Sequence, residues 1–174
     1  MKFRNLADAT STAILMYQHD YWIYANKAAE NLSGYSWEEL KNRRFWEFIA
    51  PEYVDIVRER GRKRQTKQFV DPHYEFKIIT KQGQEKWVYL QGTTTEINGA
   101  PAGLLSVIDI SERKKNEEKE RLKQRRMRQQ RNALALLFVD KAVVNGEIGT
   151  ALEGITKVAG ETLRTARAAV WFFS

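Results

Sequence analysis

The sequence has two histidines and no cysteine, which limits the chemistry open to this chain. Without cysteine there are no disulfides, thiolate metal ligands or cysteine nucleophiles. We find no Ser/His/Asp order with motif context, no glycine-rich phosphate loop and no histidine-rich metal spacing. Stabilisation of a helix N-terminus explains the pair Glu38 and Glu39 better than acid–base catalysis does. The sequence therefore predicts no catalytic residue, no metal site and no enzyme activity for this chain.

A junction between two elements is more informative. The apolar, β-branched segment 103–110 runs without a loop into a long charged helix. We call the residues at this junction the joint: Asp109, Ile110, Ser111, Glu112 and Arg113. We expect the Ser111 hydroxyl to cap the helix and Asp109 to be a second polar anchor. Because no loop separates strand from helix, the joint is predicted to transmit a change from one to the other.

The elements around the joint follow from the apolar pattern. Two stretches, 12–24 and 74–110, carry the two-residue period of β-strands. Asn98-Gly99 in the second stretch is the strongest short hairpin signal. The order is two strands, helices, then three strands. It predicts an α+β fold, a five-stranded antiparallel sheet with the helices inserted between strands two and three.

Capping residues predict where the inserted helices begin and end. Asn26 occupies an N-cap position, and Gly34 suits the left-handed residue that ends this helix. Ser36 and Glu39 have the spacing of a capping box, so the next helix begins at once. Pro51 suits the first position of a further helix that ends before residue 69.

The net charge of +7 lies in two segments. Residues 112–131 hold ten basic and four acidic side chains, and residues 58–67 hold six basic and one acidic. In the first of these segments the glutamates can pair with Lys or Arg three or four residues away. It also lacks a recognisable base-reading motif. We therefore interpret it as a solvated helix and predict no nucleic-acid partner.

Bulk composition fits a small core with an extended polar stretch, since 43% of the 174 residues are hydrophobic. No stretch approaches the roughly 18 apolar residues of a membrane span. The apolar run near the start is too short for a signal peptide. We expect a cytoplasmic chain with no membrane segment within this fragment.

Together these motifs resemble the PAS sensor domain in its sensory-box form, over about residues 3–114. The matching segments are Asn26–Ala29, Gly34–Leu40, the hairpin from Tyr74–Phe76 to Trp87-Val88, and Asp109–Lys114. The family usually closes on Asp-Ile-Thr, and here Ser111 keeps the hydroxyl. The resemblance implies cytosolic signalling through the C-terminal helix to a kinase, cyclase or DNA-binding module.

The later part of the chain predicts a second, truncated domain. A charged helical linker is expected over 112–132, after a PAS domain at 1–111. From 133 to 174 the sequence is similar to the opening of a GAF domain, with an amphipathic helix at 148–163 and an apolar strand at 168–173. We therefore expect a histidine kinase or cyclase output domain elsewhere in a longer parent protein.

A PAS-like domain implies a ligand pocket between its sheet and the inserted helices. The candidate lining residues are Trp22, Tyr24, Trp46, Phe48, Ile49, Val57, Phe76, Trp87, Leu105 and Val107. The alternative is that these side chains only fill a small core, where aromatic residues are expected in any case. If a ligand binds, the aromatic excess favours a flat or apolar molecule.

Two cofactors of the family are disfavoured here. Its haem-binding members usually carry an axial histidine on the long helix, and residues 51–67 contain none. His19 and His73 are expected to be exposed. The blue-light flavin branch requires a reactive cysteine, and this chain has none. The cofactor is unknown, and a noncovalently bound small ligand is compatible with the sequence.

Three functional hypotheses stay open at this point. The favoured one is a sensory input module that detects a small molecule, a redox state or a partner. The second is a constitutive dimerisation module without a ligand, formed by an N-terminal cap of Phe3, Leu6 and Ala7 and by the C-terminal helices. The third and least favoured is nucleic-acid binding by the basic helix.

Overall fold

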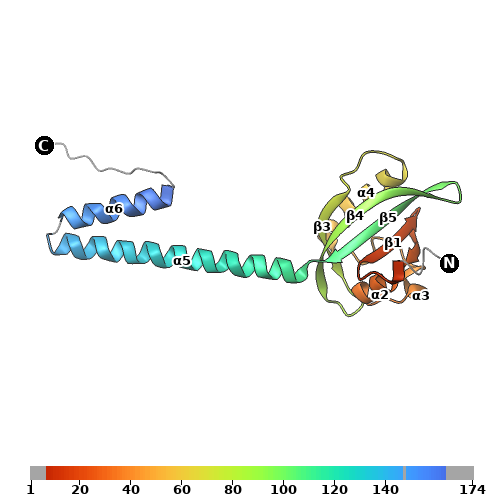
Figure 1. Ribbon diagram of the computed structural model, residues 1–174, viewed down its shortest axis with the longest axis horizontal. Coiled ribbons are helices and arrows are strands. Elements are labelled where there is room, and N and C mark those ends of the chain that lie inside the picture. Colours follow the sequence, from red (N-terminus) through yellow and green to blue (C-terminus); the bar gives the residue numbers. More distant parts are fainter. Residues whose placement is uncertain (1–6, 147, 164–174) are drawn as a thin grey trace. The chain divides into compact units, whose positions relative to one another are not determined.

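The computed structural model describes residues 7–146 and 148–163 (Figure 1). The chain divides into two compact units, Met1–Lys115 and Asn116–Ser174, which we describe separately. The first unit holds the sheet, the inserted helices and the joint. Phe3 and Leu6 of the expected N-terminal cap lie outside the described residues, as does the strand expected at 168–173.

Five antiparallel strands form one sheet in the order β2-β1-β5-β4-β3. They are β1 (Ala13–Gln18), β2 (Tyr21–Ala25), β3 (His73–Ile79), β4 (Glu85–Ile97) and β5 (Ala100–Asp109). Asn98 and Gly99 turn the chain between β4 and β5 with φ of 51° and 76°, the positive values that a tight two-residue hairpin requires. The predicted α+β fold with one five-stranded antiparallel sheet is confirmed, and the structure adds the order of the strands within the sheet, in which β1 lies beside β5.

Three helices and one 3-10 turn lie between β2 and β3, as expected (Figure 1). They are α2 (Lys27–Ser33), α3 (Trp37–Leu40), η1 (Pro51–Tyr53) and α4 (Val54–Gln65). Pro51 opens the 3-10 turn and not the α-helix itself, which begins three residues later. Apolar side chains of α2, α4 and the sheet share one core.

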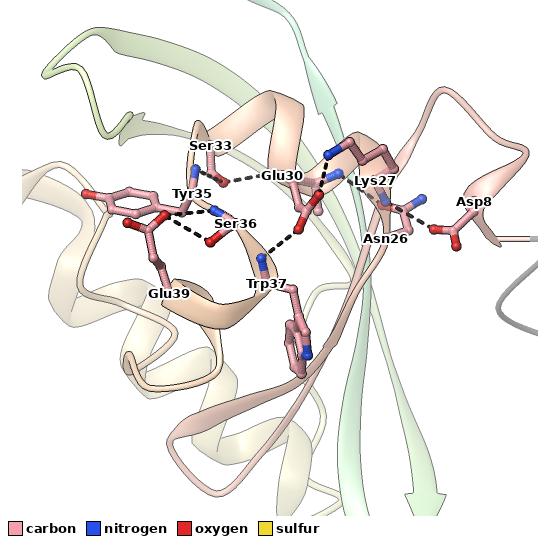
Figure 2. A network of polar contacts seen from close by, with 10 residues as sticks. Asp8, Asn26, Lys27, Glu30, Ser33, Tyr35, Ser36, Trp37 and Glu39 are labelled. Carbon is pink, nitrogen blue, oxygen red and sulfur yellow. Dashed lines mark hydrogen bonds and ion pairs between the residues drawn. The ribbon is translucent and has the colours of Figure 1, made fainter.

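The structure confirms the predicted caps of α2 and α3. Gly34 ends α2 in the left-handed conformation, with φ 79°. Ser36 and Glu39 form the capping box of α3, and Figure 2 shows the Glu39 carboxylate accepting the N–H and the hydroxyl of Ser36. Hydrogen bonds from Lys81 and Ser36 lower the pKa of Glu39 to about 2.

Asn26 does more than cap α2, because its side chain is buried at 1% exposure and joins three segments. Its Oδ1 accepts the N–H of Ala29 in α2 at 3.0 Å and that of Ile14 in β1 at 2.9 Å. Its Nδ2 donates to the carbonyls of Ala7 and Thr12 at 2.7 and 2.9 Å. This one amide therefore ties the N-terminal segment, β1 and α2 together.

Two helices follow the sheet. α5 (Ser111–Val144) is one helix of 34 residues and continues past the expected linker boundary at 132. α6 (Ile148–Leu163) occupies the span predicted for the amphipathic helix. Among the described residues, no helix is both long enough and apolar enough to span a membrane.

The buried position of Asn26 predicts a large loss of stability on truncation. Asn26→Ala should lower the free energy of unfolding by about 3 kcal/mol, since it removes a cap and leaves buried backbone groups unpaired. Ser36→Ala is the matched control at an exposed N-cap and should cost about 1 kcal/mol. Urea unfolding measures both, and equal losses would contradict the bridging role of Asn26.

Candidate functional site

An apolar cavity of about 50 Å³ lies among the sheet, α2, α4 and the segment before η1. Seven of the predicted lining residues are in its wall: Trp22, Phe48, Ile49, Val57, Phe76, Leu105 and Val107. Its aromatic members contact one another, and the rings of Trp22 and Phe48 are stacked with centroids 5.8 Å apart. The sheet and the inserted helices thus both contribute to the wall of this cavity.

Tyr24 lies outside this cavity wall because of a β-bulge. The register between β1 and β2 shifts between Met16 and Tyr17, so that Met16 pairs with Tyr24 but Tyr17 pairs with Trp22. Ile23 is therefore an extra residue on β2. The bulge moves Tyr24 to the face opposite Trp22, which regular alternation in the sequence did not predict.

Trp46 and Trp87 also lie outside the wall of the cavity. Trp46 is buried beneath α4, where the guanidinium groups of Arg58 and Arg62 lie 4.8 and 5.6 Å from its ring centroid. Trp87 is out of phase with Val88 on β4, and alternation turns it to the opposite face of the sheet. Both placements correct the sequence prediction.

Several residues of the cavity wall are not among the predicted lining residues, for example Tyr17, Phe45 and Arg64. Each of the three packs against a glycine. A Cβ on Gly103 would lie 2.0 Å from Tyr17, one on Gly61 2.3 Å from Phe45, and one on Gly92 2.6 Å from Arg64. Glycines inside a helix and two strands are a sequence signal for such close approaches.

Of the described residues that line the cavity, only Arg64 is charged. The residue is 4% exposed, and its Nη1 donates to the Tyr17 hydroxyl at 3.4 Å. That hydroxyl donates in turn to the Gly61 carbonyl at 3.0 Å. Burial raises the pKa of Tyr17 and of Tyr74, and the nearby Arg64 only partly opposes this. Both phenols are therefore neutral at neutral pH.

The joint is fastened to β4 through Trp87. The Trp87 N–H donates to the Ser111 hydroxyl at 2.9 Å, and the Ile110 N–H donates to the Trp87 carbonyl at 2.8 Å. Asp109 Oδ1 accepts the N–H of Ser111 at 2.9 Å. We expected Ser111 to cap the helix, but Asp109 binds the first N–H of α5 and the Ser111 side chain binds the sheet.

Charge pairs add to these bonds. Burial raises the pKa of Asp109, but hydrogen bonds from Ser111 and Lys86 outweigh burial and lower it overall. On β3, Glu75 pairs with Arg113 at 2.5 Å and with Lys114 at 2.6 Å. Hydrogen bonds from Lys114 and Arg113 lower the pKa of Glu75. The first turn of α5 is thus bonded to both β3 and β4.

The remaining predicted residues at this junction are Ile110 and Glu112. Ile110 is buried at 8% exposure, and its carbonyl accepts the N–H of Lys114. Glu112 is exposed in the first turn of α5. The joint therefore combines one apolar anchor with several polar ones.

The histidines lie apart from this cavity wall. His19 lies in the turn between β1 and β2 with φ 56°. His73 begins β3, where its Nδ1 lies 2.7 Å from the Tyr89 hydroxyl in an exposed pair. Among the described residues, no group of three or more His, Asp or Glu side chains could hold a metal ion.

The model of the PAS fold family matches residues 22–108, which is half of the chain. This chain belongs to the PAS family. The match spans the sheet from β2 to β5 and every inserted helix. A search of curated proteins finds no match.

Solved structures share the PAS fold. A sensory box histidine kinase/response regulator from Burkholderia thailandensis has 18% identity and a TM-score of 0.55, over 74% of this chain and 99% of that one. A PAS domain from Colwellia psychrerythraea also has 18% identity and a TM-score of 0.55, over 64% of this chain and 96% of that one. A PAS domain from Desulfitobacterium hafniense has 17% identity and a TM-score of 0.51, over 60% of this chain and 98% of that one. At such identities the likeness concerns the fold alone.

The ion pairs of Glu75 predict how the joint responds to substitution and to pH. Glu75→Gln should speed amide hydrogen exchange in the first turn of α5, yet change the unfolding free energy by less than about 1 kcal/mol, since the pairs are partly exposed. In the wild type, lowering the pH should have the same effect only below the ordinary glutamate range, because pairing lowers this pKa.

Glu118→Gln is the matched control, since it breaks a pair with Arg121 further along α5. It should leave exchange in the first turn unchanged. Hydrogen exchange followed by mass spectrometry resolves the two segments. Equal exchange in both variants would show that Glu75 does not hold the helix.

Proposed function

We propose that this chain is the sensory input module of a larger signal-transduction protein. Its PAS domain would respond to a small molecule, a redox change or a partner, and α5 would pass the response to a downstream output domain. The observation that carries this proposal is the joint, where the first turn of α5 is bonded to the same two strands that line the cavity.

Alternation along β3 and β4 supplies the proposed link, because successive side chains of a strand point to opposite faces. On β3, Phe76 lines the cavity and its neighbour Glu75 pairs with α5. On β4, Leu90 lines the cavity, and the backbone of Trp87 is bonded to Ser111. A shift of either strand on the cavity side therefore moves an anchor of the helix.

Such a link transmits a signal only if two arrangements of the joint differ in their affinity for whatever the cavity binds. The polar contacts of the joint suit this role because they lie near the surface and each is individually weak. Their rearrangement costs less than repacking the core would.

The coupling can be tested without a known ligand. Val57→Phe fills part of the cavity, and in a fusion of the chain to a histidine kinase reporter it should change the output. Adding Asp109→Ala with Ser111→Ala should reduce that change by about 10-fold, since a coupling energy of 1–3 kcal/mol is typical. Neither Asp109 nor Ser111 lines the cavity, so the affinity for a ligand of the cavity should be unchanged.

The matched control is Glu118→Ala with Arg121→Ala, which removes an ion pair of α5 outside the joint. It should leave the effect of Val57→Phe intact. If the joint variant also left that effect intact, the proposed route through Asp109 and Ser111 would be wrong. A double-mutant cycle gives the coupling directly.

We also propose that the chain forms a homodimer through α5. This helix exposes several large apolar side chains, namely Leu122 (42%), Met127 (55%), Leu134 (56%) and Leu136 (67%). Met127 and Leu134 are seven residues apart and therefore lie on one face of the helix, which a second copy would cover. Ala7, the described member of the expected N-terminal cap, is buried within its own unit at 3% exposure, so α5 is the better-supported contact.

Ultracentrifugation tests this at micromolar concentration. Met127→Glu with Leu134→Glu should convert a dimer to a monomer by placing charges at the contact. Gln129→Glu with Asn132→Glu adds the same charge to the opposite side of the same helix and should leave the dimer unchanged. A monomeric wild type would contradict the proposal.

Residues 133–174 are proposed to open a GAF domain after the linker 112–132. Support comes from the amphipathic α6, in which Ala151 is buried at 3% exposure while Ile155 is 41% exposed. An apolar face of this kind requires further partner elements. An output domain of the kinase or cyclase class would follow in the parent protein.

A further inference from the structure

One side of β4 has no neighbouring strand past the end of β3 (Figure 1). β3 pairs with residues 85–91 of β4, and the Gly92 N–H then donates to the Pro72 carbonyl at 2.8 Å. Proline has no N–H with which to continue the ladder. In the part of the chain that the structure describes, residues 93–97 pair with β5 alone. We call their other side the open edge.

Backbone alternation shows which groups face the open edge. In an antiparallel strand, successive residues alternate in the side to which their N–H and C=O point. Since the Gly92 N–H points toward β3, those of Thr94 and Glu96 point to the open edge. Pro101 lies opposite Glu96 on β5 and has no N–H to donate to it, which agrees with this direction. No described residue accepts a hydrogen bond from the N–H of Thr94 or Glu96.

A groove of about 440 Å³ lies along the open edge, lined by Lys67, Gln68, Thr94, Thr95 and Glu96. Backbone and side-chain bonds to the end of α4 hold both of its walls. The Gln68 N–H donates to the Lys63 carbonyl at 3.0 Å, and the Thr94 hydroxyl donates to the Arg64 carbonyl at 2.9 Å. Unpaired N–H and C=O groups at a sheet edge are a template to which an extended peptide adds a strand.

Two opposite charges of this groove are available to an occupant. Lys67 and Glu96 are both exposed, and neither is in an ion pair with a described residue. Side chains directly opposite each other in an antiparallel pair interact, and opposite charges there are favourable. The groove therefore suits a strand that places a cation opposite Glu96 and an anion toward Lys67.

We propose that an extended segment of a partner protein binds the open edge as an antiparallel sixth strand. A basic residue of this segment lies opposite Glu96, and an acidic residue two positions later lies opposite Thr94 and toward Lys67. A second copy of this chain fits less well, because Lys67 and Gln68 flank its own open edge. The groove shares no residue with the apolar cavity or the joint, so the proposal is independent of the sensory function.

Nitrogen-15 NMR of the whole chain tests the binding, with acetyl-Val-Lys-Val-Glu-Val-amide as the probe. This peptide should shift the amide signals of Thr94 and Glu96 saturably. The reversed order, acetyl-Val-Glu-Val-Lys-Val-amide, places a carboxylate opposite Glu96 and should bind about 3-fold more weakly. No saturable shift, or equal binding of both orders, would overturn the proposal. If these signals shift on dilution of the free chain, a second copy occupies the edge and the proposal is wrong.

Backbone methylation of the probe separates strand pairing from side-chain contact. N-methylation of its lysine and glutamate blocks the two N–H groups that face the open edge, and should weaken binding at least about 10-fold. N-methylation of its second and third valines adds the same groups on the far side and should change binding by less than about 2-fold. Equal weakening by the two methylations would exclude an added strand.

Two variants of one residue test the edge from the protein side. Glu96→Pro removes an N–H of the open edge and no ladder bond to β5, so it should fold, and it should weaken probe binding at least about 5-fold. Glu96→Gln is the matched control, since it keeps the N–H, and it should weaken binding by no more than about 3-fold. Equal binding by the two folded variants would contradict the proposal. If Glu96→Pro does not fold, the methylated probes decide.

Discussion

The two-residue period of β3 and β4 is the constraint on which the rest of this structure depends. It places Phe76 and Leu90 in the cavity wall and leaves Glu75 and Trp87 to hold the first turn of α5. Because both sets belong to the same two strands, the backbone cannot shift on one face without moving the other. A small domain thereby connects its interior to a helix through hydrogen bonds and exposed ion pairs, which rearrange at lower cost than a packed core.

Several arginines of α4 pack against aromatic side chains of the domain. Arg58 and Arg62 lie over Trp46, and Arg60 lies over Tyr74 with its guanidinium 4.4 Å from the ring centroid. Arg64 goes further and enters the cavity wall. Three of the six basic side chains at 58–67 therefore lie over aromatic rings, where cations are favourable. The charge of this segment gives no separate reason to propose nucleic acid as a partner.

A family that shares a fold does not share a ligand, so the chemistry must be argued from the residues of this cavity. The aromatic excess had favoured a flat or apolar molecule. The volume of the cavity, about 50 Å³, adds that such a molecule would have to be small.

The sequence by itself determined the features that depend on neighbours in the chain. These are the Asn98-Gly99 hairpin and the caps at Asn26, Gly34 and Ser36, all of which are set by backbone conformation over a few residues. Only the tertiary structure decided the bulge that turns Tyr24 away from the cavity, the bond from Ser111 to Trp87 and the burial of Arg64. Their partners lie on other elements: Ser111 is 24 residues from Trp87, and Arg64 is 47 from Tyr17. No local pattern encodes such contacts, since they exist only once the sheet and the helices have packed.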